Sequence, residues 1–494
     1  MNIVDQIRDY AQTTPDKIAI QYNEIAITYK DFINCIHQVG NGLLSISTEK
    51  NNKVAIFLHN KVEFLEVFLG AISAGYIPVP MDPKWSDKEI NYVLSICEPT
   101  VLFIDEEFMG KVTNVHYPHY PAIVVGGNYI EWRQRYSTRI PTILHQPSTL
   151  FIGFTSGTTG DPKGFVRSHH SWIESCYTTK DAFLMKQQDH IIAPGPLVHS
   201  MSLFAAFNTL FLGATFQLID KFSPVKVVQV MQRVENTVLY LVPTMIEGLL
   251  SYLRKHTVNF FEPKSIISSG AKWTEESKLE VSKLFSNSDV FEFYGSSEAS
   301  YIAYLPATEQ IIKPKSVGKP FPNVKISIRH DDGTEVETGE IGQLFVSSDM
   351  MFDCYFKNEI ETDKVLKGSW LALGDYALKD REGYLYIVGR AKNMMITGGL
   401  NVFPEEIEDV LRSLDEVSEV MVYGHPDTYW GEKIVAIIQW KSNKELSHLQ
   451  IKEYCRKHLA TYKIPQIIKS VKDFQYTGSG KIARDKMQKQ IVEA

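Results

Sequence analysis

The sequence has little cysteine, and none of it is arranged to hold a metal or to close a disulfide framework. The five cysteines are scattered, odd in number and never spaced as CxxC. This argues against a disulfide-stabilised fold and against a structural zinc site. Reduced cysteines are typical of a cytoplasmic protein, and we predict that location.

Strong charge of one sign and a clear membrane-spanning run are also missing. The formal net charge is -7 over 494 residues, without clustered Lys and Arg, so no nucleic-acid partner is expected. The N-terminal residues 1–12 carry three charges, which predicts a short amphipathic helix and no signal peptide. The most apolar stretch, residues 202–219, is interrupted by polar residues and Gly213. We predict a buried helix followed by a buried strand there and no transmembrane segment, with contact to lipid-like substrates as a minor alternative.

What is present is the pattern of a large α/β protein. Short runs rich in Val, Ile and Phe alternate with segments of helical period, which predicts parallel sheets covered by helices on both faces. The predicted strands are residues 53–58, 100–104, 149–153, 237–241, 265–268 and 290–293, and the predicted helices between them include 62–74 and 274–285.

The last hundred residues have the pattern of a separate small α/β domain. Pro404 is followed by two acidic residues, which suits the first turn of a helix. Strands are predicted at 417–423 and 434–438, and a helix at 447–459.

The segment FTSGTTGDPKG, residues 154–164, is the strongest chemical signal. Its glycines allow close approach of the backbone to an anion, and its hydroxyls and N–H groups can donate to phosphate oxygens. It is not a Walker A loop, because Lys163 is followed by Gly164 and not by Ser or Thr. No GxGxxG follows the first strand either, so a dinucleotide fold has no support.

This loop resembles the phosphate loop of the adenylate-forming superfamily, which contains acyl-CoA synthetases, the adenylation domains of peptide synthetases and firefly luciferase. The chain is most similar to fatty-acid–CoA ligases. Further segments that carry the resemblance, in family order, are ITYKDF (27–32), GYIPVPMDP (75–83), PLVHS (196–200), YGSSE (294–298), LGDYA (373–377), GRAKNMMITGGLNVFPEEIE (389–408) and TGSGKIAR (477–484). The resemblance implies a large N-terminal domain of parallel or mixed sheets flanked by helices, residues 1–391, and a small mobile α/β domain, residues 392–494.

The resemblance also implies roles for individual residues. Lys481, Glu298, His199 and Thr155 are the expected catalytic residues, and Glu298 and Thr155 the expected Mg²⁺ ligands, since carboxylate and hydroxyl oxygens suit that ion. The residues expected to bind nucleotide or coenzyme A are Ser156, Gly157, Thr158, Thr159, Lys163, Gly270, Ala271, Lys272, Tyr294, Gly295, Ser296, Ser297, Asp375, Arg390, Gly398 and Gly399.

The small domain is expected to turn about Lys392, so that it presents either Lys481 or the Gly398–Gly399 loop to the reaction. Gly399 would leave room for the pantetheine arm, and a simple turn role stays equally open. Three departures from the family pattern are mild: Ser297 and Leu373 stand where threonine is common, and FQYT at 474–477 lacks a usual proline.

These features predict an acid–CoA ligase that uses ATP, Mg²⁺ and coenzyme A. His199 and Ser200 stand where amino-acid-activating domains have an aspartate, so an α-amino acid substrate is disfavoured. The apolar candidates Met201, Phe204 and Val242 favour a medium- or long-chain fatty acid, then an aryl acid, then an aromatic dicarboxylic acid. Transfer to an acyl-carrier protein, a homodimer, and a non-catalytic nucleotide sensor are left open.

Overall fold

The structure is a computed structural model of the 494-residue chain, and it describes residues 2–49, 52–112, 121–155, 162–271, 273–441, 445–476 and 482–492. The chain divides into two compact units. Unit 1 contains residues 1–314, 318–325 and 347–364, and unit 2 contains residues 315–317, 326–346 and 365–494. The predicted domains, residues 1–391 and 392–494, are defined by the expected hinge at Lys392, and this division stays a prediction. Within the described ranges, no helix has both the length and the apolar character needed to cross a membrane.

Unit 1 is built on a mixed nine-stranded sheet. Its inner strands β1, β10, β9, β11, β12 and β13 run parallel, as the sequence predicted, and antiparallel strands close both edges. In spatial order the strands are β15 (Lys319–Pro320), β14 (Ser300–Pro306), β13 (Asp289–Ser296), β12 (Ser265–Ser268), β11 (Thr237–Leu241), β9 (His190–Ile192), β10 (Thr215–Leu218), β1 (Ile18–Tyr22) and β2 (Ile25–Thr28).

Two smaller sheets complete unit 1. One is fully parallel, with the order β4 (Ile77–Pro80), β3 (Lys53–Phe57), β5 (Val101–Asp105) and β6 (Ala122–Val125). The other is antiparallel, with the order β18 (Cys354–Tyr355), β8 (Lys163–Ser168) and β7 (Thr149–Thr155).

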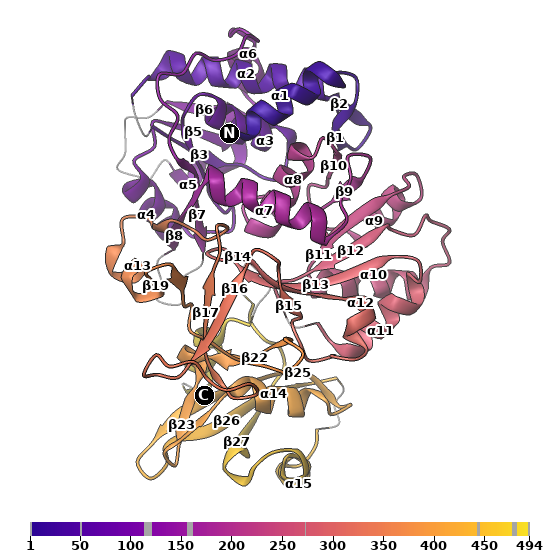
Figure 1. The fold of residues 1–494 in the computed structure, drawn as a ribbon, viewed down its shortest axis with the longest axis vertical. Coiled ribbons are helices and arrows are strands. Elements are labelled where there is room, and N and C mark those ends of the chain that lie inside the picture. The colour runs from indigo at the N-terminus through magenta and orange to yellow at the C-terminus, as the bar shows by residue number, and fades with distance from the viewer. Residues whose placement is uncertain are drawn as a thin grey trace. The chain divides into compact units, whose positions relative to one another are not determined.

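Helices separate the strands of unit 1, and α1 and α2 lie side by side (Figure 1). The longer helices are α1 (Ile3–Thr13), α2 (Tyr29–Ile46), α3 (Val62–Ser73), α4 (Asp87–Cys97), α7 (His169–Ala182), α8 (Ser200–Phe211), α9 (Pro224–Met231), α10 (Pro243–Lys255) and α11 (Glu275–Leu284). The shorter ones are α5 (Met109–Val112), α6 (Tyr129–Gln134), α12 (Ala307–Gln310) and α13 (Glu359–Val365), with a 3-10 turn at Glu106–Phe108.

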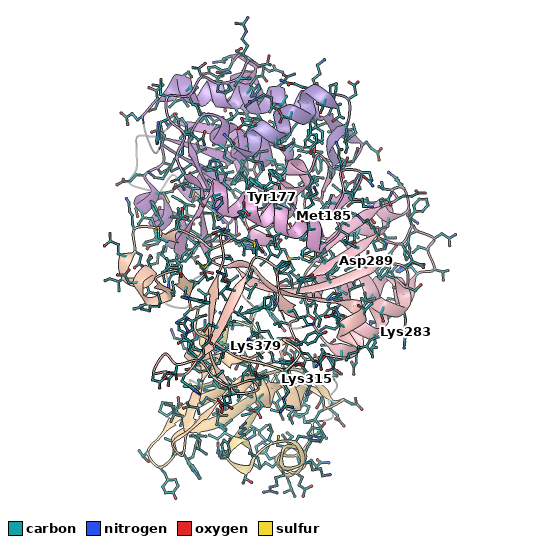
Figure 2. The ribbon with its side chains drawn as sticks, in the orientation of Figure 1. Tyr177, Met185, Lys283, Asp289, Lys315 and Lys379 are labelled. Carbon is teal, nitrogen blue, oxygen red and sulfur yellow. The ribbon has the colours of Figure 1, made fainter. Side chains whose placement is uncertain are left out.

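The apolar stretch 202–219 is the buried helix α8 followed by the buried strand β10, which confirms the prediction. Gly213 joins them with φ of +72°, and a Cβ there would lie 2.6 Å from the Tyr10 ring. Met185, labelled in Figure 2, contacts α8 and β11, since its sulfur accepts hydrogen bonds from Asn208 and Tyr240, both at 3.4 Å.

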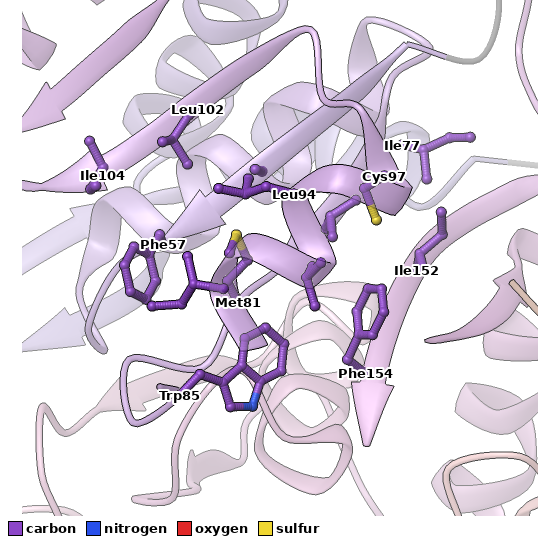
Figure 3. Close-up of a cluster of buried hydrophobic side chains, with 14 of the residues drawn as sticks. Phe57, Ile77, Met81, Trp85, Leu94, Cys97, Leu102, Ile104, Ile152 and Phe154 are labelled. Carbon is purple, nitrogen blue, oxygen red and sulfur yellow. The ribbon is translucent and has the colours of Figure 1, made fainter. Parts of the chain in front are cut away.

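The core under the phosphate-loop hairpin is aromatic and aliphatic. Phe154, near the end of β7, packs edge-on against Trp85 with ring centroids 6.0 Å apart, beside Met81, Leu94 and Ile152 (Figure 3). Burying such side chains stabilises a fold by about 25 cal/mol per Å² of apolar surface. The strand that leads into the loop therefore has a fixed position.

Unit 2 contains two sheets. The first has the order β19 (Leu366–Lys367), β20 (Trp370–Leu371), β17 (Gly342–Ser347), β21 (Asp375–Lys379) and β22 (Leu385–Arg390), with β16 (Lys325–Arg329) on β17. The second has the order β24 (Leu400–Val402), β23 (Met395–Thr397), β26 (Gly431–Trp440) and β25 (Val417–Asp427), with β27 (Ile467–Val471) on β26. Its helices are α14 (Pro404–Arg412), α15 (His448–His458) and α16 (Arg484–Val492), so the predicted small α/β fold is confirmed.

Candidate functional site

The hairpin β7–β8 positions the two ends of the predicted phosphate loop. Thr155 and Lys163 pair across it, and the Thr155 hydroxyl lies 3.5 Å from the carbonyl oxygen of Lys163. Gly153 is required by packing, because a Cβ there would lie 2.3 Å from the Phe165 ring. Ser156, Gly157, Thr158 and Thr159 lie outside the described residues. The described ends thus place a hydroxyl and a cation side by side.

Lys163 makes two contacts near its ammonium group. Its Nζ atom lies 2.5 Å from Oε2 of Glu361 and 4.7 Å from the centre of the Tyr355 ring. Glu361 also pairs with Lys364 at 2.5 Å. The hydrogen bonds from Lys163 and then Lys364 lower the pKa of Glu361 to about 2, so it is ionised at neutral pH. In this structure the predicted phosphate-binding cation already has a carboxylate partner.

The end of β13 and the turn that follows it carry five of the predicted site residues, all half-buried: Tyr294, Gly295, Ser296, Ser297 and Glu298. Only glycine fits at 295, since a Cβ there would lie 1.9 Å from the carbonyl oxygen of Ser300. Ser300 itself has φ of +59°, a left-handed conformation that a non-glycine residue adopts at a cost. The Ser297 hydroxyl is 2.9 Å from that of Ser200, which joins this turn to the PLVHS segment.

Glu298, the predicted Mg²⁺ ligand, is held by a tyrosine. The Tyr355 hydroxyl donates to Oε1 of Glu298 at 2.9 Å, and the backbone N–H of Phe352 donates to the Glu298 carbonyl at 2.6 Å. A half-buried carboxylate fixed at one oxygen suits a hard divalent cation, which prefers oxygen ligands. Tyr355 therefore contacts both predicted charge-bearing groups, the Glu298 carboxylate and the Lys163 ammonium.

A buried arginine, Arg167, fixes the backbone of the same turn. It lies on β8 with 1% of its surface exposed, and it donates to the carbonyl of Ser297 at 2.8 Å and to the Ser300 hydroxyl at 2.7 Å. It also donates to the carbonyl of Met350 at 2.6 Å and to the Ser171 hydroxyl at 3.3 Å.

A charge buried among neutral partners is costly unless its hydrogen bonds are made. Burial lowers the pKa of the Arg167 guanidinium to about 9, although the nearby carboxylates of Asp353 and Glu298 raise it in part. The group is still charged at neutral pH, and its four donated bonds fix the position of the turn.

His199 precedes helix α8, and its Nε2 lies 3.6 Å from Oδ2 of Asp82. That Nε2 atom is buried and has no hydrogen-bond partner among the residues that the structure describes. Burial lowers the pKa of His199, while Asp82 raises it and Lys84 lowers it further, so the ring is neutral at pH 7. Folding therefore brings an acid to His199 that the local sequence lacks, although the other Asp82 oxygen accepts from the backbone of Lys84 at 2.9 Å.

Gly270 and Ala271 follow β12 and are exposed, while Lys272 lies outside the described residues. A Cβ at Gly270 would lie 3.4 Å from Cγ1 of Val242, so this glycine adjoins one apolar pocket candidate. Another candidate, Phe204, is 4% exposed and packs between the rings of Trp172 and Tyr301, which makes it part of the core.

In unit 2, Asp375 begins β21 and Arg390 ends β22, directly opposite each other. Nε of Arg390 donates to Oδ1 of Asp375 at 2.8 Å, and Asp375 is 4% exposed. The two residues predicted near the ribose thus form one charge-assisted pair, which holds the carboxylate in a defined orientation. Lys392, the predicted hinge, lies in the 3-10 turn Ala391–Asn393.

Gly398 and Gly399 form the tight turn between β23 and β24, with φ of +57° and +79°. A Cβ at Gly399 would meet no described atom within 4 Å. The backbone conformation is therefore a sufficient local reason for both glycines. Lys481 lies outside the described residues, so its predicted role stays a prediction.

Sequence reasoning missed the residues that support the predicted site: Arg167, Glu361, Tyr355 and Asp82. Arg167 had a weak signal, because it is a lone charge at the end of the apolar run GFV. Glu361 and Tyr355 had none, since they reach Lys163 from almost two hundred positions away in the chain.

The comparisons with known proteins agree with this arrangement. The family model described as AMP-binding enzyme matches residues 7–356, and that of the AMP-binding enzyme C-terminal domain matches residues 406–481. The chain is 37% identical to the uncharacterized acyl-CoA ligase YhfT of Bacillus subtilis, covering 100% of this chain and 99% of that protein. It is 30% identical to the putative long chain fatty acid-CoA ligase VraA of Staphylococcus epidermidis, covering 99% and 98%.

Solved structures show the same fold over nearly the whole chain. ATP-bound MatB from Rhodopseudomonas palustris has a TM-score of 0.90 at 25% identity, covering 99% of both chains. The o-succinylbenzoate CoA synthetase MenE from Bacillus subtilis, in complex with its acyl-adenylate, has a TM-score of 0.88 at 26% identity, covering 98% of this chain and 97% of the other. The chain therefore belongs to the AMP-binding enzyme family, as an ATP-dependent, AMP-forming acyl-CoA ligase.

Proposed function

We propose that this ligase activates a medium- or long-chain fatty acid and transfers it to coenzyme A. A carboxylate oxygen attacks the α-phosphorus of ATP, the bond to the β-phosphate oxygen breaks, and pyrophosphate leaves. The thiolate of coenzyme A then attacks the acyl carbon, the bond to the AMP oxygen breaks, and AMP leaves with the electron pair. Adenylation makes the acyl carbon reactive because AMP is a far better leaving group than oxide.

The observation that carries the substrate proposal is the end-to-end match to relatives named as putative long chain fatty acid-CoA ligases, at 30% identity over 99% of the chain. The chemistry around His199 supports it. The neutral imidazole offers no counter-charge to an amino group, and the Asp82 carboxylate next to it is already engaged. An ammonium group buried there without a free carboxylate would be costly.

The contacts of the described residues support the following proposed roles in the reaction. Glu298 and Thr155 are proposed to hold Mg²⁺, which when bound neutralises phosphate charge. Lys163 is proposed to contact the leaving phosphates, Tyr294 to stack on adenine, and Asp375 to accept the ribose hydroxyls. Tyr355 would orient Glu298 through its hydrogen bond. Such positioning supplies a large part of catalysis in phosphoryl-type transfer.

A mass-spectrometric product screen tests the proposal. The protein is incubated with MgATP, coenzyme A and a pool of fatty and aromatic acids, and again without coenzyme A. A fatty acyl-CoA supports the proposal. An aroyl-CoA would instead favour an aryl acid, acyl-AMP alone would favour a carrier-protein acceptor, and neither product would favour a nucleotide sensor.

Replacing Glu361 with glutamine is expected to lower the KM for ATP. The substitution removes the carboxylate that pairs with Lys163. The phosphate of ATP then no longer has to displace Glu361 from the Lys163 ammonium group. Both partners are partly exposed, and such pairs are worth about 0.2–1 kcal/mol, so the effect is about 1.4- to fivefold. Steady-state kinetics at varied ATP measures it.

The matched control is Glu359→Gln, an exposed acid on the same helix α13. It removes the same charge without touching Lys163, and its KM should equal that of the unmodified enzyme. A KM that rises in Glu361→Gln would mean that the pair helps to place Lys163 and does not compete with phosphate.

A further inference from the structure

An open pocket of about 530 Å³ lies on unit 1 between helices α1 and α2 and the segment after α6, elements that Figure 1 shows together. None of the residues predicted to take part in the ligase reaction lines it. Three permanent cations do: Arg8 from α1, Lys30 from α2 and Arg139 from the segment after α6. Ligand sites typically have volumes of about 300–1,000 Å³ and a few convergent polar groups.

A buried histidine forms part of the pocket wall. His37, on α2, is 4% exposed, and its Nδ1 lies 2.9 Å from the carbonyl oxygen of Thr138. Because a carbonyl only accepts, Nδ1 carries the proton and donates it. The other ring nitrogen, Nε2, is buried and has no hydrogen-bond partner within the described part of the chain. Such a buried, unmatched polar atom is costly, which points to a ligand.

The charge at this pocket is not balanced by its own lining. No carboxylate is among the lining residues. Asp5 pairs with one end of Arg8, at 3.1 Å from NH2, while the buried Nε of Arg8 has no partner among the residues described. Arg8, Lys30 and Arg139 against Asp5 leave about two positive charges, which match a doubly charged anion.

The rest of the lining is partly apolar. Ala11, Ile33 and Ile140 contribute aliphatic surface, and Ile140 is 53% exposed. Exposed aliphatic surface next to cations suits a ligand that has an apolar group attached to its anion.

We propose that this pocket binds a phosphate monoester with an apolar substituent, its phosphate held by Arg8, Lys30, Arg139 and the Nε2 atom of His37. Guanidinium and ammonium groups donate to the phosphate oxygens, and these charge-assisted bonds are strong. At Nε2 the bond forms either from a phosphate hydroxyl or, after the ring takes up a proton, to a phosphate oxygen. The site is separate from ligase chemistry and fits an effector.

Calorimetric titration of the full-length protein with phenyl phosphate tests this proposal, with inorganic phosphate as the arm that lacks the apolar group. Lys30→Ala/Arg139→Ala removes two exposed cations of the pocket. We expect affinity for phenyl phosphate to fall at least about tenfold, since each hydrogen bond to a charged group contributes measurably. Phenyl phosphate should bind more tightly than inorganic phosphate.

The matched control is Lys255→Ala/Arg381→Ala, which removes the same charges from exposed positions elsewhere. Anions also enter the predicted phosphate loop, so the difference between the two double variants is what reports on this pocket. Equal affinities in both double variants, or no binding at about 10 mM phenyl phosphate, overturn the proposal.

A second measurement isolates His37. Burial lowers the pKa of the free His37 ring, the hydrogen bond to Thr138 raises it in part, and Arg8 lowers it further. A dianion bound next to the ring raises this pKa, because it favours the charged form. Sulfate keeps its two charges between pH 6 and 7.5, and the charged groups that line the pocket with His37 are Arg8, Lys30 and Arg139. Sulfate should therefore bind more tightly as pH falls, because the ring takes up a proton on binding.

His37→Asn should abolish that dependence. Its amide can still donate to Thr138, so the fold is preserved, but nothing replaces Nε2. A dependence on pH that is identical in His37→Asn and in the unmodified protein would contradict the role of this ring.

Discussion

Replacing Lys481 with alanine is expected to stop acyl-adenylate formation while ATP still binds. Under the proposed function, this lysine holds the attacking carboxylate and the α-phosphate together while negative charge accumulates at phosphorus. A positioned cation that acts at the developing charge is worth about 10²–10³ in rate, and more where it also orients the reactants. Pyrophosphate release measures the first half-reaction, and calorimetry with ATP measures binding.

Two controls accompany the Lys481 experiment. Lys486→Ala removes an exposed lysine from α16, five positions further along the chain, and should leave pyrophosphate release unchanged. Synthetic acyl-adenylate and coenzyme A should still give thioester with Lys481→Ala, because only the first half-reaction needs the lysine. Undiminished pyrophosphate release would contradict the role, and a loss of ATP affinity would make Lys481 a binding residue.

The second large effect is expected for Arg167→Met. The side chain has a similar length and packs in an apolar setting, but it donates no hydrogen bonds. The carbonyls of Ser297 and Met350 then lose their partner, and each unsatisfied buried group costs about 1–3 kcal/mol. Removing the buried charge offsets part of this, so we expect the free energy of unfolding to fall by about 2–4 kcal/mol. Denaturant unfolding measures it.

Arg167→Met should also impair catalysis, which a purely structural residue would not do. Loss of the bonds to Ser297 and Ser300 frees the turn that carries Glu298, and misplacement by about 1 Å can cost about 10²-fold in rate. The half-saturating Mg²⁺ concentration should rise together with the fall in kcat. Activity at varied Mg²⁺, below the unfolding transition, measures both.

The controls for Arg167 separate charge from geometry. Arg167→Lys keeps the charge but cannot reproduce four bonds in a fork, so it should restore stability only in part and leave Mg²⁺ affinity weakened. Arg233→Met removes an exposed arginine whose ion pair with Glu24 spans 3.3 Å, and it should change neither quantity. Reduced stability with unchanged kcat and Mg²⁺ dependence would show that Arg167 acts only in the core.

Helices and strands were predictable where the residues of one short segment are sufficient to favour that structure. The strand at Thr237–Leu241 is a continuous apolar run, and the helix at Pro404–Arg412 begins at a proline followed by two acids. The resemblance implied parallel or mixed sheets, but not which strands of the large sheet pair antiparallel. Pairings such as β1 with β2 and β13 with β14 depend on turns that periodicity does not report.

The candidate site divides in the same way. The family resemblance predicted that Glu298, Lys163, Asp375 and Arg390 belong to one site, because each lies in a short family motif. The structure adds that Asp375 and Arg390 face each other across two strands, and that Glu298 and Lys163 both touch Tyr355. These contacts cannot be inferred from the spacing of the motifs along the chain.

By itself, the sequence determined the fold class, the family and the reaction type, because each depends on patterns within a few neighbouring residues. Only the tertiary structure decided which side chains share a partner. The Glu361 carboxylate reaches Lys163, Asp82 reaches His199 and the Arg167 guanidinium reaches Ser297. These contacts join segments far apart in the chain. Burial also strengthens the Arg167 bonds, because it excludes water from the guanidinium and its partners.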